Sequence, residues 1–297
     1  MGLQKRLFGI GSALLLAGIT LSSHIAGTTS VSAGQGNASV KPDLSVILKA
    51  TAEYSRKLES VIFDFTCLEE IKETIDPLLD VLKPSDIALD RTRVHSLAGQ
   101  IRKIKASFVH DYQCIRQGGK IRESRILLEE DGEKKHVPNA ELKTASFVFG
   151  NALLAPISIF AERNQPAYDF TIIGTENINK VQFVVIEAKQ KAHADNARCS
   201  YGKAWLDPSS ADILRIEWRE THIGNWELFE ERGKKFLRTP RLTMGTELNI
   251  EKNGMRFPSA LRIEETYVDE KGRAFIRTKV DAEYKDFKFF TVEVEIK

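Results

Sequence analysis

The chain has 297 residues, of which 42% are hydrophobic and 28% charged, with 19 Gly and 9 Pro. This composition is that of a globular protein, and it excludes collagen, a coiled coil and a disordered chain. The 43 basic and 41 acidic residues give a formal net charge of only +2. Nucleic-acid binding depends mainly on an excess of positive charge that neutralises phosphates, so we expect no nucleic-acid partner.

The first 33 residues have the pattern of a cleavable signal peptide. Lys5 and Arg6 precede an apolar run from Leu7 to Leu21, and the small residues Val31 to Ala33 follow. The run is shorter than the roughly 20 residues of a membrane-spanning helix. We predict cleavage after Ala33, a disordered lead-in over residues 34–42, and a soluble periplasmic protein that contacts membranes only transiently. An uncleaved membrane anchor is the alternative.

The next segment predicts one helix and then a β meander. Apolar residues at near-helical spacing predict a helix capped by Asp43 and ending near Ser60. Alternating apolar residues predict strands over 61–67 and 106–114. The turn at 117–120 leads into a third strand over 121–129, so these strands should form antiparallel hairpins. Residues 71–103 are predicted as an insertion with a short helix after Asp76-Pro77.

The second half begins with an apolar helix, Ser146 to Glu162, interrupted by Pro156. Strands are predicted after it over residues 170–173, 181–185, 203–206, 214–218, 242–250, 255–263, 274–282 and 292–296. Asn253-Gly254 is a strong hairpin signal between two of these strands. Nothing after residue 42 resembles a linker, so residues 43–297 are expected to form a single domain.

A sheet of this many strands curls, because the twist of successive strands accumulates. We therefore predict a mainly β (α+β) fold, a strongly curved antiparallel half-barrel covered by a few helices. Its apolar cavity is expected to be lined by Phe63, Phe65, Phe108, Tyr112, Phe183, Leu214, Ile216, Leu248 and Leu261. The 146–162 helix is expected to be a movable lid that carries Phe149, Leu153, Leu154, Ile157 and Phe160. An ordinary core position is the alternative for each of these residues.

Four short segments carry a resemblance to a known family. They are FTCLEE at 65–70, LLAP at 153–156, IGTE at 173–176 and YGKAWLDPSS at 201–210. Together with the order of elements, they resemble the outer-membrane lipoprotein-sorting (LolA-like) superfamily, whose fold RseB-like sensors share. The chain departs from the family pattern in three features: the 71–103 insertion, the three cysteines and the stretch from Gly224 to Thr239.

The resemblance implies a function as well as a fold. Family members hold lipoprotein acyl chains in a half-barrel under a helical lid, or act as periplasmic sensors. We therefore expect an exported soluble binding protein whose partner is a lipid acyl chain or a lipidated protein. A sensor or protein-interaction module that binds another envelope protein is the alternative.

Signals for catalysis are weak. The five histidines after the signal peptide include no pair at metal-ligand spacing, and G-x-S-x-G is absent. We predict no cofactor, no metal and no catalytic residue, and we expect a protein that is not an enzyme; an envelope hydrolase ranks third. His110 is interpreted as a core imidazole. Glu69, Glu70 and Asp111 are interpreted as solvated positions on strands, and Trp205, Trp218 and Trp226 as core or rim.

The cysteines should meet an oxidising compartment after export, where exposed thiols do not usually stay free. Cys67 and Cys114 both fall on the apolar faces of their strands, so we predict a disulfide between them. Spacing alone does not determine connectivity. Three buried free thiols, with Cys199 as the third, are the competing interpretation.

Overall fold

The computed structural model describes residues 43–60, 64–82, 99–117, 120–141, 144, 147, 159–178, 180–192, 201–220 and 226–290. The predicted signal peptide, the lead-in, most of the predicted lid, Cys199 and the last predicted strand lie outside these residues. None of the described helices combines the length and apolarity that a membrane crossing requires.

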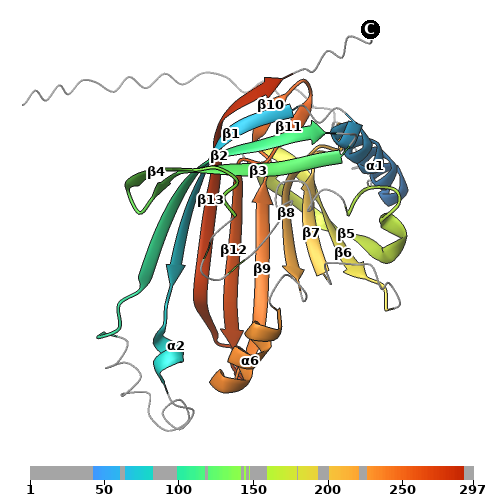
Figure 1. Ribbon diagram of the computed structural model, residues 1–297. Helices are drawn as coiled ribbons and strands as arrows, with labels where there is room; N and C mark the ends of the chain where they lie inside the picture. The colour runs from blue at the N-terminus through green and yellow to red at the C-terminus, as the bar shows by residue number, and fades with distance from the viewer. Residues whose placement is uncertain are drawn as a thin grey trace, which may run out of the picture. The chain divides into compact units, whose positions relative to one another are not determined.

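Eleven antiparallel strands form one strongly curved sheet (Figure 1) in the order β4-β3-β2-β1-β13-β12-β9-β8-β7-β6-β5. The strands are β1 (Asp64–Ile75), β2 (Ile104–Gln117), β3 (Lys120–Glu130), β4 (Glu133–Val137), β5 (Tyr168–Ile178), β6 (Val181–Gln190), β7 (Tyr201–Leu206), β8 (Ile213–Glu220), β9 (Thr239–Glu247), β12 (Ala260–Val268) and β13 (Ala274–Phe290). The two end strands, β4 and β5, are not paired with each other. The sheet is therefore an open half-barrel, which confirms the predicted fold class.

The helix α1 (Leu44–Ser60) covers one face of this sheet, which we call the inner face. Ile47, Tyr54 and Leu58 of α1 pack into the same core cluster as Phe65 of β1. The backbone N–H and the Oγ–H of Ser45 both donate to Asp43 Oδ1 at 2.8 Å, which confirms the predicted cap. At the far end of α1, the N–H of Arg256 donates to Tyr54 Oη at 2.9 Å.

Two further helices are anchored by one buried carboxylate, Glu265 of β12. These are α2 (Leu78–Val81), which follows β1 as predicted, and α6 (Trp226–Phe236). Glu265 Oε1 accepts from Arg232 Nη1 of α6 at 3.0 Å, and Glu265 Oε2 accepts from Arg277 Nη1 at 3.1 Å. Arg277 Nε also donates to Asp80 of α2 at 3.0 Å. The short helix η1 (Gln165–Ala167) precedes β5.

Several element boundaries differ from the predicted ones. β1 continues to Ile75, so the first five residues of the predicted insertion belong to the sheet. The predicted strand over 255–263 is two strands, β11 (Met255–Phe257) and β12, because Pro258 between them has no N–H for a sheet ladder. β11 pairs with β10 (Ile250–Lys252) in a separate hairpin. Its turn has φ of 52° at Asn253 and 71° at Gly254, as the Asn-Gly signal predicts.

The helix α6 was not predicted, although the sequence contains its pattern. Phe229 and Phe236 are seven residues apart and both are buried. Glu227 lies in the first turn and Lys234 and Lys235 in the last, an order of charges that the helix dipole favours. The helix therefore occupies most of the stretch that departs from the family pattern.

Candidate binding site

Six of the predicted cavity residues lie on the inner face, but they pack against one another. Each is 7% exposed or less, and all belong to one hydrophobic core cluster. They are Phe65, Phe108, Tyr112, Ile216, Leu248 and Leu261. In this structure the inner face is thus filled by the chain's own side chains.

Two of the predicted cavity residues were wrong, because they point to the outer face of the sheet. Phe183 and Leu214 pack with Val185 and Trp205 in a small separate cluster, whereas Val184 belongs to the inner core. Neighbouring residues of a strand point to opposite faces. Because β6 is apolar on both faces at this point, alternation alone did not show that Val184 points inward and Phe183 does not. On β8 a register shift breaks the alternation: Trp205 lies opposite Arg215 and Leu206 opposite Ile213, so Leu214 is an extra residue and faces away from Ile216.

The remaining predicted site residues are mostly outside the described part of the chain. Phe63 of the cavity lies there, as do Phe149, Leu153, Leu154 and Ile157 of the predicted lid. Phe160 is described: it is buried in the inner core and lies in a turn at the end of the predicted helix. The lid hypothesis therefore stays a prediction.

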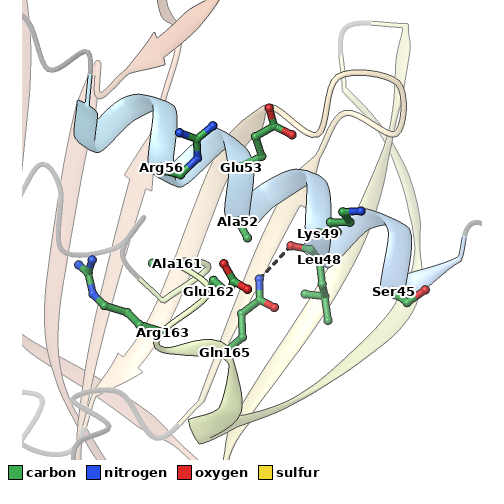
Figure 2. Close-up of a pocket in the computed structure, with 10 residues that line it drawn as sticks. All are labelled: Ser45, Leu48, Lys49, Ala52, Glu53, Arg56, Ala161, Glu162, Arg163 and Gln165. Atoms are coloured by element: carbon green, nitrogen blue, oxygen red, sulfur yellow. Dashed lines mark hydrogen bonds between the residues drawn. The ribbon is translucent and has the colours of Figure 1, made fainter.

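A groove of about 840 Å³ opens between α1 and the turn that leads into η1 (Figure 2). We call it the α1 groove. One wall is the helix face that carries Ser45, Leu48, Lys49, Ala52, Glu53 and Arg56, and the other wall carries Ala161, Glu162, Arg163 and Gln165. Leu48 packs partly against the inner core. The groove thus borders the apolar interior.

The side chain of Gln165 connects the two walls. Its Nε2 donates to the carbonyl oxygen of Leu48 at 2.8 Å and to that of Phe160 at 2.9 Å, and Figure 2 shows the first of these bonds crossing the groove. The backbone oxygen of Leu48 also accepts from Thr51 Oγ1 at 3.0 Å. The Gln165 amide therefore links the turn to α1.

The rim of the α1 groove carries both signs of charge, with one more cation than anion. Arg56 and Arg163 come from opposite walls and lie toward the same end in Figure 2. Glu53 is 3.4 Å from Lys57, which lies outside the groove lining. The lining combines the apolar residues Leu48, Ala52 and Ala161 with polar and charged side chains, which suits a molecule that has both an apolar and a polar part.

A second group of residues, which we call the buried polar cluster, lies on the inner face and was not predicted. It consists of Glu69, His110, Tyr112, Arg125 and Tyr284. Arg125 Nε donates to Glu69 Oε2 at 2.7 Å and Arg125 Nη2 donates to Glu69 Oε1 at 3.1 Å. His110 Nδ1 is 3.3 Å from Glu69 Oε2. The interpretation of His110 as a core residue is confirmed, since it is buried.

The solvated position predicted for Glu69 was wrong, because the residue is 0% exposed. The sequence already indicated that Glu69 points inward. Phe65, Cys67 and Ile71 are buried on the same face of β1, and Glu69, two residues from both Cys67 and Ile71, points to that face as well. Glu70, on the opposite face, is only half-buried and pairs with Lys285 at 2.9 Å.

Burial and hydrogen bonding shift the pKa values of these groups. Burial alone would raise the pKa of Glu69, but the interactions with His110 and Arg125 outweigh it and hold this pKa below its ordinary value. Burial raises the pKa of Tyr112 and of Tyr284 well above the ordinary tyrosine value. Both phenols therefore stay protonated and remain O–H donors.

The predicted disulfide is absent, since Cys67 and Cys114 are both free and buried. The strand register explains this. Cys67 lies opposite Tyr112, and Cys114 lies opposite Phe65, so the two cysteines are diagonal neighbours. Diagonal positions are about 7–8 Å apart, beyond ordinary disulfide geometry. Burial raises the pKa of Cys67, and it raises that of Cys114 to about 12.

No family model and no curated protein matches this chain. Its fold is similar to three solved structures at 11% identity. One is a putative outer membrane lipoprotein-sorting protein domain from Vibrio parahaemolyticus; the match covers 84% of this chain and 94% of that chain, with a TM-score of 0.42. The second is a DUF1329 family protein from Desulfovibrio piger, where the match covers 82% of this chain and 92% of that chain, with a TM-score of 0.36. The third is a LolA superfamily protein from Nitrosomonas europaea, where the match covers 83% of this chain and 94% of that chain, with a TM-score of 0.34. The printed descriptions of two of these structures name the lipoprotein-sorting fold that the sequence resembles. At these TM-scores the likeness carries no argument about a ligand or an activity.

Proposed function

We propose that this chain is an exported envelope protein that binds an amphiphile, a lipid acyl chain or a lipidated protein, on the inner face of the half-barrel. The observation that carries the proposal is the α1 groove, which borders the apolar interior at Leu48 and has charged side chains on its rim. The apolar chain would enter between α1 and the 161–165 turn. The signal-peptide pattern of residues 1–33 supports a place outside the cytoplasm.

Loading requires the inner face to open, because its side chains are packed together in this structure. Each buried apolar side chain contributes roughly 1.5–3 kcal/mol to the closed state, and the incoming chain must replace that burial. The contact between Gln165 and Leu48 is a single neutral hydrogen bond, worth about 1 kcal/mol. We infer that loading begins with separation of the 161–165 turn from α1.

Two alanines of α1 allow a matched test. Ala52 lines the α1 groove, whereas Ala50, two residues earlier and also half-buried, does not. We expect Ala52→Phe to weaken binding of a fluorescent fatty acid about 10-fold or more, and Ala50→Phe to leave it nearly unchanged. Native mass spectrometry of protein purified from its own periplasm, followed by extraction of the lipid, identifies the bound molecule. Absence of any acyl chain in both assays would refute the proposal.

The filled inner face favours the second candidate, a sensor or protein-interaction module without lipid transport. In that case the wild type takes up no acyl chain, and the α1 groove receives a segment of an envelope protein. Site-specific photo-cross-linking from position 49 or 56 in cells separates the two candidates, since only the second predicts a protein adduct without lipid.

The third candidate, an envelope hydrolase, has little support in the described residues. The raised pKa of Cys67 keeps its sulfur as a thiol, and a thiol is a poor nucleophile. Both carboxylate oxygens of Glu69 accept hydrogen bonds from Arg125, which ties this carboxylate up in an ion pair. Within the described part of the chain, no cluster of His, Cys, Asp and Glu is suited to hold a metal ion.

A further inference from the structure

The helix α6 and the segment that follows it border a second groove, of about 610 Å³, which we call the α6 groove. One wall is formed by Trp226, Glu230 and Lys234 of α6, and the other by residues 237–240, where the chain passes from α6 into β9. Figure 1 shows α6 at the start of β9, well away from α1. The α6 groove is therefore separate from the α1 groove, and no residue lines both.

Leu237, directly after the helix, combines two locally unfavourable features. Its φ is 53°, in the left-handed region that favours glycine at this position after a helix. Two backbone hydrogen bonds hold this conformation. The N–H of Leu237 donates to the carbonyl of Lys234 at 3.2 Å, and the N–H of Arg238 donates to that of Gly233 at 2.9 Å. The side chain of Leu237 is nevertheless 61% exposed, so burial within the described chain gives no reason for a leucine here.

Leucine is also unusual among the residues of the described chain that have a positive φ. The other six such residues that are not glycine are aspartate, asparagine, lysine or alanine. A second large apolar side chain, the half-buried Trp226, lies on the opposite wall of the α6 groove. A large apolar side chain that is held in a strained conformation and exposed to solvent points to a contact with another molecule.

The α6 groove also carries charges of both signs that the described chain leaves unpaired. Glu230 and Lys234 are exposed and lie four residues apart, a spacing at which ion pairs often form along a helix. Neither of them makes an ion pair with a described residue. Arg238 makes none either, and its Nε is buried without a hydrogen-bond partner among the described residues. The groove can therefore pair with charges of both signs from outside.

The order of charges along α6 is self-complementary. The acids Glu227, Glu230 and Glu231 lie in its first half, and the unpaired bases Lys234 and Arg238 lie toward its other end. A second copy of the helix in the antiparallel direction reverses this order, so acids and bases face each other twice. The exposed acids Glu227 and Glu231 also disfavour an anionic membrane as the occupant.

One alignment of the two helices satisfies the apolar and the charged side chains together. With the two-fold axis beside the midpoint of Glu230 and Gly233, Trp226 lies opposite Leu237 of the second copy. Glu230 then lies opposite Gly233 of the second copy, which has no side chain to exclude it, and next to Lys234. Each of these contacts occurs twice, as the symmetry requires.

We propose that α6 is an interface between two copies of this chain, which pair antiparallel about a two-fold axis through their α6 grooves. The inference does not depend on the proposed function, because it concerns a different groove. A helix of 11 residues is only about 16 Å long. Two such helices bury less than the roughly 1,200–2,000 Å² of a standard interface, so we expect weak association, with monomer and dimer in exchange at micromolar concentrations.

Charge reversal gives the sharpest test, because the interface is symmetric. In sedimentation velocity on protein purified from the periplasm, we expect Glu230→Lys and Lys234→Glu each to weaken dimerisation about 10-fold, since like charges then meet twice. An equimolar mixture of the two variants should associate about as tightly as the wild type, because opposite charges face each other again. Lys72→Glu, at an exposed position of β1 outside the groove, is the control and should leave the dimer unchanged.

Leu237→Gly separates an interface role from a structural one. This variant should weaken dimerisation about 10-fold, because an apolar contact is lost twice. Its Tm, measured at a concentration where the wild type is monomeric, should equal or exceed that of the wild type, since glycine adopts the left-handed conformation without strain. A lower Tm with unchanged dimerisation would make Leu237 a structural residue and overturn the inference.

Three further outcomes would contradict the interface. The first is a wild type that stays monomeric at every concentration measured. The second is a mixture of Glu230→Lys and Lys234→Glu that associates no better than either variant alone. The third is binding of the wild type, but not of Leu237→Gly, to phosphatidylglycerol vesicles without dimerisation, which would make the α6 groove a membrane contact. All three leave the proposed function of the α1 groove untouched.

Discussion

Glu69 and Arg125 form a two-bond ion pair inside the sheet, although 56 residues separate them in the sequence. The two side chains come from β1 and β3, with β2 between these strands. Both residues are buried. A bidentate arginine leaves neither charge uncompensated, which is the condition under which a buried ion pair is tolerated.

Removal of one partner of this pair should be strongly destabilising. We expect Glu69→Gln to lower the free energy of unfolding in urea by about 3–5 kcal/mol, because Arg125 then stays buried without its counter-charge. The adjacent Glu70→Gln is the control, since Glu70 pairs with the half-exposed Lys285 on the other face. We expect it to change stability by less than about 1 kcal/mol. Equal effects of the two substitutions would contradict the structure.

The same pair predicts a pH dependence with a definite sign. The pKa of Glu69 is lower in the folded protein than the ordinary value of 4.5, so the unfolded state binds the proton more readily. The stabilisation is therefore fully present above about pH 4.5 and is lost as the pH falls through the folded pKa. The difference in unfolding free energy between wild type and Glu69→Gln should shrink on acidification. If the difference in unfolding free energy grew on acidification instead, the predicted direction of the pH dependence would be wrong.

Gly202 should tolerate no side chain, because the indole of Trp218 covers it. A Cβ at Gly202 would lie 1.6 Å from Cε3 of Trp218, which is directly opposite on β8. We expect Gly202→Ala to lower the unfolding free energy by about 3 kcal/mol or more. In Gly245→Ala the nearest atoms are 3.9 Å away, so this control should be neutral or slightly stabilising. Chemical denaturation of both variants decides the matter.

The two described cysteines should be unreactive in the native protein. Both are buried, and burial raises both thiol pKa values, so little thiolate is present at neutral pH. In a Cys199→Ser variant, Ellman's reagent should label no thiol before denaturation and two thiols in urea. Non-reducing peptide mapping that finds a Cys67–Cys114 bridge would restore the original pairing and contradict the strand register.

Gln165 should control access to the α1 groove. Gln165→Ala removes the amide that joins the turn to Leu48 and Phe160. We expect faster association of a fluorescent fatty acid in stopped flow, about 5-fold for a contact worth about 1 kcal/mol. Gln182→Ala, an exposed amide on β6 whose Nε2 is 3.4 Å from Thr175 Oγ1, is the control and should leave the rate unchanged. Equal rates in all three proteins would show that the contact does not gate the groove.

Local patterns in the sequence were sufficient for the elements and the fold class. Alternation over residues 106–114 falls within β2, and alternation over 242–250 covers most of β9 and the first residue of β10, so this prediction merged two strands. Asp43 caps α1 as predicted. The Asn253-Gly254 turn joins β10 and β11. These features depend on interactions between residues close in the chain, so periodicity and turn chemistry suffice to predict them. The helix α6 had the same kind of signal.

Only the tertiary structure decided which face each strand presents and which residues meet. Phe183 and Val184 are both apolar neighbours on β6, and only the position of α1 shows that Val184 points inward. Glu69 is buried because Arg125 and His110 arrive beside it from β3 and β2. The pairing of β1 with β13 likewise joins opposite ends of the described chain. The physical reason is that hydrophobic burial depends on area and carries no direction. The sequence therefore determined the strands, while the arrangement of the whole sheet decided what each side chain contacts.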